Sequence, residues 1–234
     1  QNADSRTALN NETWEYDGNA WIQRFPTRSP APRSNHALFY DPVRRVTTLY
    51  GGDTELANPR AGDIWTWDGT NWTERVISGA RPEFGPFGSP ARPRMVWDVR
   101  RGHAVLPPTS LNQGGPLDYA TWTWDGEAWT RRPYAFTGFG SAPWIAGSGL
   151  GLVYDTFRGE VIYWGGDQGD QARLWRWNGD TWRLDPIPEQ VGHHLNAAAA
   201  YDQRRHSVVW FGGNYNGNDG QPTGVSQRTF ERAL

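Results

Sequence analysis

Alternating hydrophobic and polar residues recur along the chain in short runs that end at turn-forming residues. One such run occurs four times, and each copy ends in Asp-Gly or Asn-Gly followed by two residues and a tryptophan. Alternation over about four to eight residues is typical of a half-buried strand, and the Asp-Gly or Asn-Gly pair is typical of a tight hairpin turn. The pattern therefore predicts four hairpins, at residues 11–21, 63–72, 120–129 and 173–182.

A second hairpin pattern lies between the copies of the first. Each copy has an apolar strand, an aromatic residue followed by Asp, a short basic turn and another apolar strand. Three of the four copies end in Gly-Gly, and the remaining one has Pro107-Pro108 instead. Two successive hairpins make one four-stranded antiparallel sheet, and the closing tryptophans recur at spacings of 51, 57 and 53 residues, a period typical of propeller blades. These inner hairpins begin near residues 36, 94, 151 and 198.

The aromatic-Asp pair, the basic turn, the Gly-Gly strand end and the closing tryptophan together resemble the kelch repeat over roughly residues 11–213. The resemblance implies an all-β propeller of four-stranded antiparallel blades. In each blade the aromatic-Asp strand lies nearest the channel, followed outward by the Gly-Gly strand, the Trp strand and the strand with the closing tryptophan. Kelch propellers serve as adaptors, lectin-like modules and enzyme domains, so the resemblance implies the fold more specifically than the function.

Three blades are complete in the sequence, and a fourth is divided between the two ends of the chain. The C-terminal part supplies an inner pair of strands at 196–213, and the N-terminal part supplies an outer pair at 12–23. We expect N-terminal strands to pair with C-terminal ones, which closes four blades into one domain over residues 1–234 without an exposed sheet edge. The complete blades are predicted at residues 36–74, 94–131 and 150–184.

Residues 214–234 are expected to form a tail, but their sequence leaves a second interpretation open. The segment 229–232 (TFER) resembles the segment 13–16 (TWEY), which is a strand of the first hairpin pattern. On this interpretation the chain is part of a larger propeller, and the four-blade ring does not form.

Composition excludes several classes of chemistry. The chain has no cysteine, so disulfides, thiolate nucleophiles and Cys-ligated metals are excluded. The chain has no lysine, and all 23 residues counted as Lys or Arg are arginine, which excludes Schiff-base and P-loop lysines. The net charge is −2, so no nucleic-acid partner is predicted. The chain has no run of eighteen apolar residues, so no membrane insertion is predicted.

Tryptophan is unusually frequent, at 15 residues. Fourteen of them fall in the repeat register, and we predict that these rings pack between blades. Trp144 lies outside the register in a long loop, where it either stacks on a sugar ring or covers the edge of the core.

Candidate binding residues lie where the repeats differ, on loops that a rigid scaffold holds. The kelch resemblance implies that the positions after Gly-Gly and the loops between blades share one face. Carboxylates and an amide there can bind a cation, a sugar hydroxyl or an arginine, with a solvated polar rim as the alternative. The predicted ligand-binding residues are Asp53, Asp167, Asn214, Arg33, His36, Arg92, Trp144 and His193.

Catalytic and metal motifs are not found in the sequence. There is no GxSxG, HExxH or GxxxxGK[ST] pattern, so no catalytic residue and no cofactor are predicted. His193 and His194 are adjacent, and neighbouring residues of a strand point to opposite faces, so no metal site is predicted.

These observations favour a non-enzymatic binding module that holds a protein segment or a glycan on its loop face. One alternative is a carbohydrate-active enzyme similar to kelch-type sialic-acid mutarotases or to sialidases, with Asp53 and Asp167 as the carboxylate pair to test. Another is a structural repeat domain of a larger surface protein. We expect a monomer at the surface of, or outside, a bacterial cell, because an Arg-rich, Lys-free composition is typical of GC-rich bacterial genomes and bacterial kelch arrays often face outward.

Overall fold

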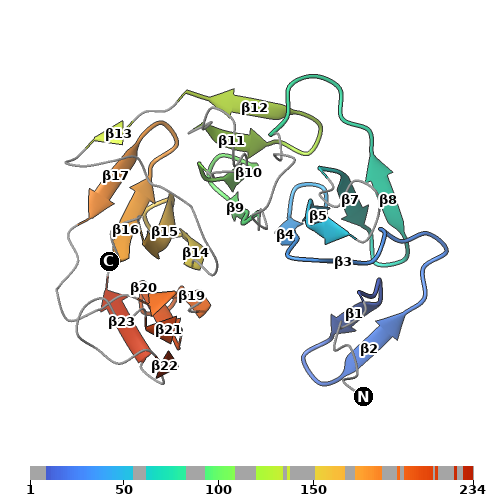
Figure 1. Ribbon diagram of the computed structural model, residues 1–234, viewed down its shortest axis with the longest axis horizontal. Helices are drawn as coiled ribbons and strands as arrows, with labels where there is room; N and C mark the ends of the chain where they lie inside the picture. Colours follow the sequence, from blue (N-terminus) through green and yellow to red (C-terminus); the bar gives the residue numbers. More distant parts are fainter. Residues whose placement is uncertain are drawn as a thin grey trace, which may run out of the picture.

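The structure, a computed structural model, consists of β-strands and turns throughout its described residues. These are residues 9–54, 62–82, 93–108, 120–133, 136–137, 151–166, 172–185, 194–195, 198–212, 214–215, 224–225 and 229–233. Figure 1 shows the sheets following one another around an arc in sequence order. The prediction of an all-β propeller built from four-stranded antiparallel blades is confirmed.

Three complete blades make up the middle of the arc, and in each of them the four strands are paired in sequence order. The first blade contains β4 (Ala37–Asp41), β5 (Val46–Tyr50), β7 (Ile64–Trp67) and β8 (Trp72–Arg75). The second contains β9 (Val96–Asp98), β10 (His103–Leu106), β11 (Thr121–Trp124) and β12 (Trp129–Arg132). The third contains β14 (Gly151–Asp155), β15 (Glu160–Gly166), β16 (Ala172–Trp177) and β17 (Trp182–Asp185), with β13 (Phe136–Thr137) added in parallel outside β17.

The turns of the inner hairpins form because an aspartate side chain closes each of them. In the first blade, Asp41 Oδ1 accepts hydrogen bonds from the backbone N–H groups of Val43 and Arg44, at 2.8 and 3.0 Å. Asp98, Asp155 and Asp202 accept equivalent bonds in the other sheets. The repeated aspartates are therefore turn-forming groups.

The ends of the arc depart from the prediction. The N-terminal hairpin, β1 (Thr13–Tyr16) and β2 (Trp21–Arg24), is a separate two-stranded sheet. The C-terminal sheet consists of β19 (Ala198–Asp202), β20 (Ser207–Phe211) and β23 (Thr229–Ala233).

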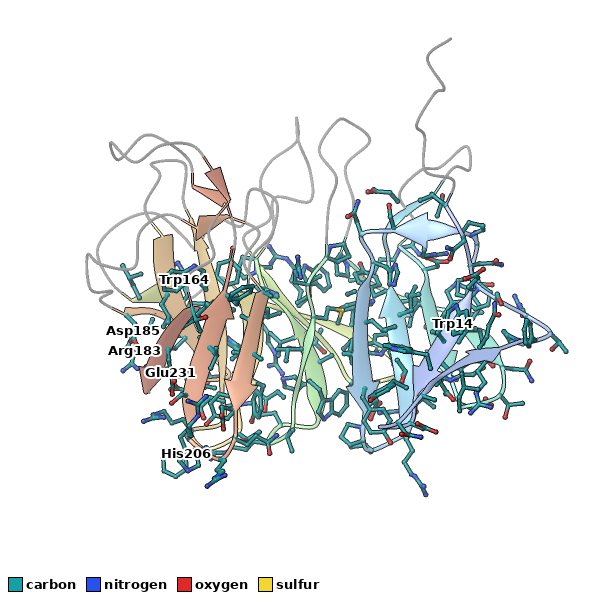
Figure 2. The ribbon with its side chains drawn as sticks, turned by 90° about the horizontal axis from the view of Figure 1, so that it is seen from below. Trp14, Trp164, Arg183, Asp185, His206 and Glu231 are labelled. Carbon is teal, nitrogen blue, oxygen red and sulfur yellow. The ribbon has the colours of Figure 1, made fainter. Side chains whose placement is uncertain are left out.

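The predicted closure, in which N-terminal strands pair with C-terminal ones, is therefore wrong. The edge of β20 that β1 would need is occupied by β23, with Trp210 opposite Phe230. Both strands have the same alternating pattern, and β23 joins β20 through a shorter stretch of chain. The expected tail contains β23 together with β21 (Asn214–Tyr215) and β22 (Gly224–Val225). Figure 2 labels Trp14 on β1 and Glu231 on β23, which lie toward opposite ends of the molecule.

A recurring hydrogen bond shows which position the N-terminal hairpin occupies. Trp182 Nε1 of the third blade donates to Thr121 Oγ1 of β11, the third strand of the second blade, at 2.8 Å. Trp72 Nε1 of the first blade donates to Thr13 Oγ1 of β1, also at 2.8 Å. Because Thr13 and Thr121 hold the same place in the repeat, β1 and β2 are the third and fourth strands of a blade that precedes the first.

Large aromatic side chains fill the space between neighbouring blades. Phe39 of the first blade stacks on Trp97 of the second, with 6.3 Å between ring centroids, and Trp164 of the third lies 4.8 Å from Trp210 of the C-terminal sheet. The predicted packing role is thus confirmed for twelve of the tryptophans in repeat register, whereas Trp14 and Trp21 are largely exposed. The buried tryptophans are residues 65, 67, 72, 97, 122, 124, 129, 164, 175, 177, 182 and 210.

Candidate ligand-binding site

The inner strands of the three blades and of the C-terminal sheet enclose a pocket of about 330 Å³, here called the axial pocket. Each wall comes from residues at or just before the start of an inner strand, so four sheets contribute to one site. The lining residues within the described part of the chain are His36–Leu38, Pro93–Met95, Gly151–Leu152 and Ala198–Ala199.

Small residues allow the inner strands to converge on this pocket. A Cβ atom added at Gly151 would lie 2.6 Å from the Cβ atom of Ala199, so β14 and β19 approach as closely as they do because position 151 is glycine. Ala37 and Ala198 hold the equivalent positions in the first blade and in the C-terminal sheet. Small residues therefore hold this position in three of the four sheets.

Arg94 holds the same position in the second blade and is the exception among these small residues. Its side chain is exposed and lines the axial pocket, and no ion pair within the described residues involves it. A guanidinium offers five N–H donors in a fixed plane, which suits carboxylate or hydroxyl oxygens. Arg94 was not among the residues predicted from the sequence, although it differs from Ala37, Gly151 and Ala198 at the equivalent positions.

His36 stands where the axial pocket meets a second pocket, described below, and lines both. Partial burial of the ring, together with the positive charge of Arg33, lowers the pKa of His36 below its ordinary value. The imidazole is therefore neutral at pH 7, with one nitrogen able to donate and the other able to accept a hydrogen bond.

Arg33, another predicted binding residue, is buried and fully engaged by its own blade. Its guanidinium donates to both carboxylate oxygens of Asp63, at 2.7 and 2.9 Å, and to the carbonyl oxygen of Gly51, at 2.9 Å. Although burial alone would raise it, the hydrogen bonds from Arg33 and Trp65 hold the pKa of Asp63 below its ordinary value. The hydrogen bonds of the Arg33 side chain therefore hold the segments around Gly51 and Asp63 together on the loop face of the first blade.

Asp53 and Asn214 occupy equivalent backbone positions. Asp53 begins β6 (Asp53–Thr54), which pairs with β3 (Arg33–Ser34), and Asn214 lies opposite Leu195 of β18 (His194–Leu195) in the same way. Asp53 Oδ2 accepts a hydrogen bond of 2.7 Å from Asn35 Nδ2, which orients the carboxylate. The other predicted binding residues, Asp167, Arg92, Trp144 and His193, lie outside the described residues.

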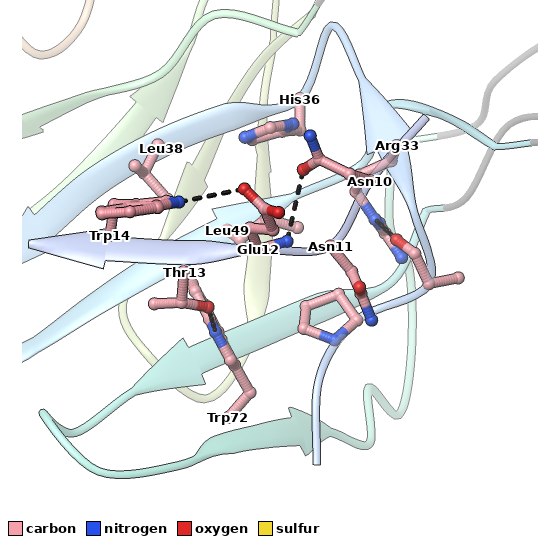
Figure 3. Close-up of a pocket in the computed structure, with 12 residues that line it drawn as sticks. Asn10, Asn11, Glu12, Thr13, Trp14, Arg33, His36, Leu38, Leu49 and Trp72 are labelled. Carbon is pink, nitrogen blue, oxygen red and sulfur yellow. Dashed lines mark hydrogen bonds between the residues drawn. The ribbon is translucent and has the colours of Figure 1, made fainter. Parts of the chain in front are cut away.

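A second pocket of about 190 Å³, here called the lateral pocket, lies between the N-terminal hairpin and the first blade (Figure 3). Trp14 Nε1 donates to Glu12 Oε2 at 3.0 Å, and the backbone N–H of Glu12 donates to Asn10 Oδ1 at 3.2 Å. Leu38 of β4 faces Trp14 across this pocket. The sequence assigned Trp14 to the core, so its place on a pocket wall is a finding of the structure.

Within the described ranges, no three His, Cys, Asp or Glu side chains are grouped closely enough to hold a metal ion. No helix in that part of the chain is long and apolar enough to cross a membrane.

Comparison with known proteins supports the fold. No family model and no curated protein matches the chain. Among solved structures, the chain is similar to one titled "Structure of YjhT", with a TM-score of 0.57 and 11% sequence identity over 87% of this chain. The fold is that of a β-propeller. The chain spans 66% of the length of that structure, just under two thirds, and at this identity the likeness concerns the fold alone.

Proposed function

We propose that this protein is a non-enzymatic binding module of the kelch type, which holds a protein segment or a glycan at its loop face. The observation that carries the proposal is the axial pocket, to which four successive sheets each contribute a segment and into which Arg94 extends. At about 330 Å³ it lies at the lower end of the range for ligand pockets, roughly 300–1,000 Å³, and suits one sugar ring or one amino-acid side chain.

The chemistry of the pocket favours a ligand group with oxygen acceptors. Arg94 supplies donors and a positive charge, while His36 supplies a neutral donor or acceptor at the rim. The remaining walls are small or apolar residues that leave room without competing hydrogen bonds. A glycan hydroxyl or carboxylate, or an acidic side chain of a protein segment, meets these requirements.

A carbohydrate-active enzyme similar to sialic-acid mutarotases or sialidases is the second candidate. The observation that favours it is Asp53, a carboxylate oriented by Asn35 on the loop face. Its suggested partner, Asp167, lies outside the described residues. A monomeric protein exposed at the surface of a bacterial cell suits either function.

Glycan and peptide arrays probed with the purified chain test the proposal. We expect a ligand whose binding weakens about tenfold or more in Arg94→Ala, because a charge-assisted hydrogen bond is lost. Arg75→Ala is the matched control, since Arg75 is an exposed arginine on the outer strand β8. Unchanged binding in Arg94→Ala, or silence on both arrays, would contradict the proposed site.

The enzymatic alternative has its own readout. The array ligands and N-acetylneuraminic acid are incubated with the protein and followed by NMR for hydrolysis or for a faster exchange of anomers. We expect no turnover. Turnover that disappears in Asp53→Asn would show that the protein is an enzyme and that the binding-module proposal is wrong.

A further inference from the structure

The face of the first blade that points toward the N-terminal hairpin is covered only over its outer half. The outer part is held by Trp67 Nε1, which donates to Glu15 Oε1 at 2.7 Å, and by the bond from Trp72 to Thr13. The inner part of the same face is bare, since Leu38 and Tyr40 of β4 are 55% and 54% exposed.

Equivalent residues at the next junction are buried. Met95, which immediately precedes β9, and Trp97 of β9 hold the positions of Leu38 and Tyr40, and they are 8% and 6% exposed. The inner strands of the first blade cover them, through contacts such as that between Phe39 and Trp97. Leu38 and Tyr40 are therefore interface residues whose covering strands are not supplied by any described segment.

The polar groups at the equivalent junctions indicate which polar residue an element that covers Leu38 and Tyr40 must have. Tyr154, which holds the position of Tyr40 in the third blade, lies on the turn headed by Asp98 of the second blade. Its hydroxyl accepts a hydrogen bond of 3.1 Å from the backbone N–H of Arg100 in that turn. Burial and the neighbouring Asp98 carboxylate raise the pKa of Tyr154 to about 12. An element that covers Tyr40 in the same way presents a turn headed by an acidic residue.

The backbone of β1 offers a pairing edge at the same place. The third strands β7, β11 and β16 each pair with a second strand on one side and a fourth on the other. Among the described strands, β1 pairs with β2 alone, so its inner edge has free N–H and C=O groups. Such an edge binds an added strand through main-chain hydrogen bonds.

The lateral pocket lies between this edge and the first blade. Figure 3 shows Leu38 near Trp14, with Thr13 of β1 and Trp72 of β8 on the neighbouring walls. On the side of the first blade the groove thus has the apolar residues Leu38 and Leu49 together with His36 and Arg33, and on the other side it ends at a hydrogen-bonding strand.

We propose that this groove, which consists of the lateral pocket with Trp14 and Leu38, the exposed Tyr40 on the same face of β4, and the free edge of β1, docks a β-hairpin of a protein partner. One strand of the hairpin pairs with β1, its apolar side chains cover Leu38, and an acidic residue in its turn lies at the Tyr40 hydroxyl. The C-terminal sheet of a second copy does not fit, because its third strand, β23, would occupy the place of β1. This inference does not depend on Arg94 or on a ligand in the axial pocket, although Leu38 borders both pockets.

A synthetic hairpin with the sequence of residues 198–212 is a suitable probe, because it has the apolar alternation and an acidic turn residue, Asp202. Cysteines added at its two ends close it into a preorganised ring, and the protein has no cysteine that could interfere. We expect saturable binding of the labelled ring in fluorescence anisotropy, with slower amide exchange in β1. The Leu38→Asp variant should weaken binding at least tenfold, whereas Val76→Asp, an exposed change on the outer surface, should not.

A double-mutant cycle tests the polar contact. Tyr40→Phe in the protein and Asp202→Asn in the probe should each weaken binding about two- to tenfold, and the two changes together should cost no more than either alone. Arg94→Ala should leave probe binding unchanged, which separates this site from the axial pocket. Absence of saturable binding, or binding that Leu38→Asp does not weaken, would overturn the proposal. A dimer of the chain alone that Leu38→Asp dissociates would overturn it in favour of a second copy.

Discussion

The N-terminal hairpin and the outer hairpin of the second blade have the same sequence pattern but different surroundings. The closing tryptophan of the first, Trp21, is 67% exposed, whereas the closing tryptophan of the second, Trp129, is 6% exposed. Both hairpins have four-residue strands, an Asp-Gly turn and the same strand register. The difference arises because β11 and β12 continue a sheet with two inner strands that pack on the first blade, while β1 and β2 form a sheet of their own.

This comparison separates what a repeat position determines from what its neighbours determine. The position of a tryptophan in the repeat determines which strand it begins and which way it points. Its burial requires the inner strands of the same blade and the face of an adjacent blade. The stabilisation that a buried side chain provides therefore depends on the junction between blades, and it differs between equivalent positions of different repeats.

The largest expected difference between the two hairpins concerns their closing tryptophans. Trp129→Ala removes a buried ring that contacts Tyr50 and Trp124, and we expect the free energy of unfolding to fall by about 3–5 kcal/mol. Trp21→Ala should cost less than about 1 kcal/mol, because little of that ring is buried. Urea denaturation of both variants measures the difference. Equal losses would show that the N-terminal hairpin is packed as tightly as its counterpart.

A smaller difference is expected for the threonines that accept the tryptophan hydrogen bonds. Thr121→Val leaves Trp182 Nε1 buried without an acceptor and should lower the free energy of unfolding by about 1–3 kcal/mol. Thr13→Val should cost less than about 1 kcal/mol, because the bond from Trp72 is only partly buried and water can replace it.

Ile64 provides the control for the threonine pair. It holds the position of Thr121 in the first blade, and Trp129 Nε1 accordingly has no hydrogen-bond partner within the described residues. Ile64→Val should therefore change the free energy of unfolding only by the loss of one methylene group, about 0.5–1.5 kcal/mol. A much larger loss of unfolding free energy would mean that Ile64 contributes more than the burial of its side chain.

The smallest expected effect is a pH dependence that is stronger in the N-terminal hairpin than in the outer hairpin of the second blade. Hydrogen bonds from Trp67 Nε1 and then from Arg24 Nε hold the pKa of Glu15 below its ordinary value. The stabilisation is therefore fully present above pH 4.5 and is lost as the pH falls through the lowered pKa, since protonation weakens both bonds. Thr123 holds this position in β11, so that hairpin has no corresponding group to titrate.

Amide exchange, corrected for its intrinsic pH dependence, measures this effect. Below pH 4.5, opening of β1 and β2 should increase more than opening of β11 and β12, because Asp17 and Asp125 accept the same turn hydrogen bonds in the two hairpins and Glu15 is present only in the first. In Glu15→Gln this excess pH dependence of β1 and β2 should disappear. A dependence that persists in this variant would assign it to another acidic residue.

The sequence predicted the hairpins and blades well because their signals are local. Asp-Gly turns, aromatic-Asp pairs and alternation over four residues involve neighbours in sequence, and they determine strand ends such as Asp41 and Trp72. Closure was mispredicted because two strands of similar sequence, β1 and β23, compete for the edge of β20. Alternation does not distinguish between them, and the outcome depends on chain connection and blade packing.

The candidate site was only partly predictable for a related reason. Arg94 departs from the small residues of its equivalents, so a comparison of repeats could have identified it. The ion pair between Arg33 and Asp63 joins residues 30 positions apart, and no local pattern marks it. Asp53 and Asn214 stay predictions that the axial pocket does not test, as do the four residues outside the described part of the chain.

The contact between Gly151 and Ala199 has a consequence for how this pocket can change during evolution. Any side chain at position 151 would collide with β19, so the distance between the third blade and the C-terminal sheet is set by the backbone. Substitutions there would separate the sheets before they altered a ligand contact. Arg94 is exposed and lines the pocket, so we expect a change of its side chain to alter ligand contacts without moving a sheet. Ligand preference can therefore change through substitutions at position 94, while the width of the axial pocket is determined by the backbone of β14 and β19.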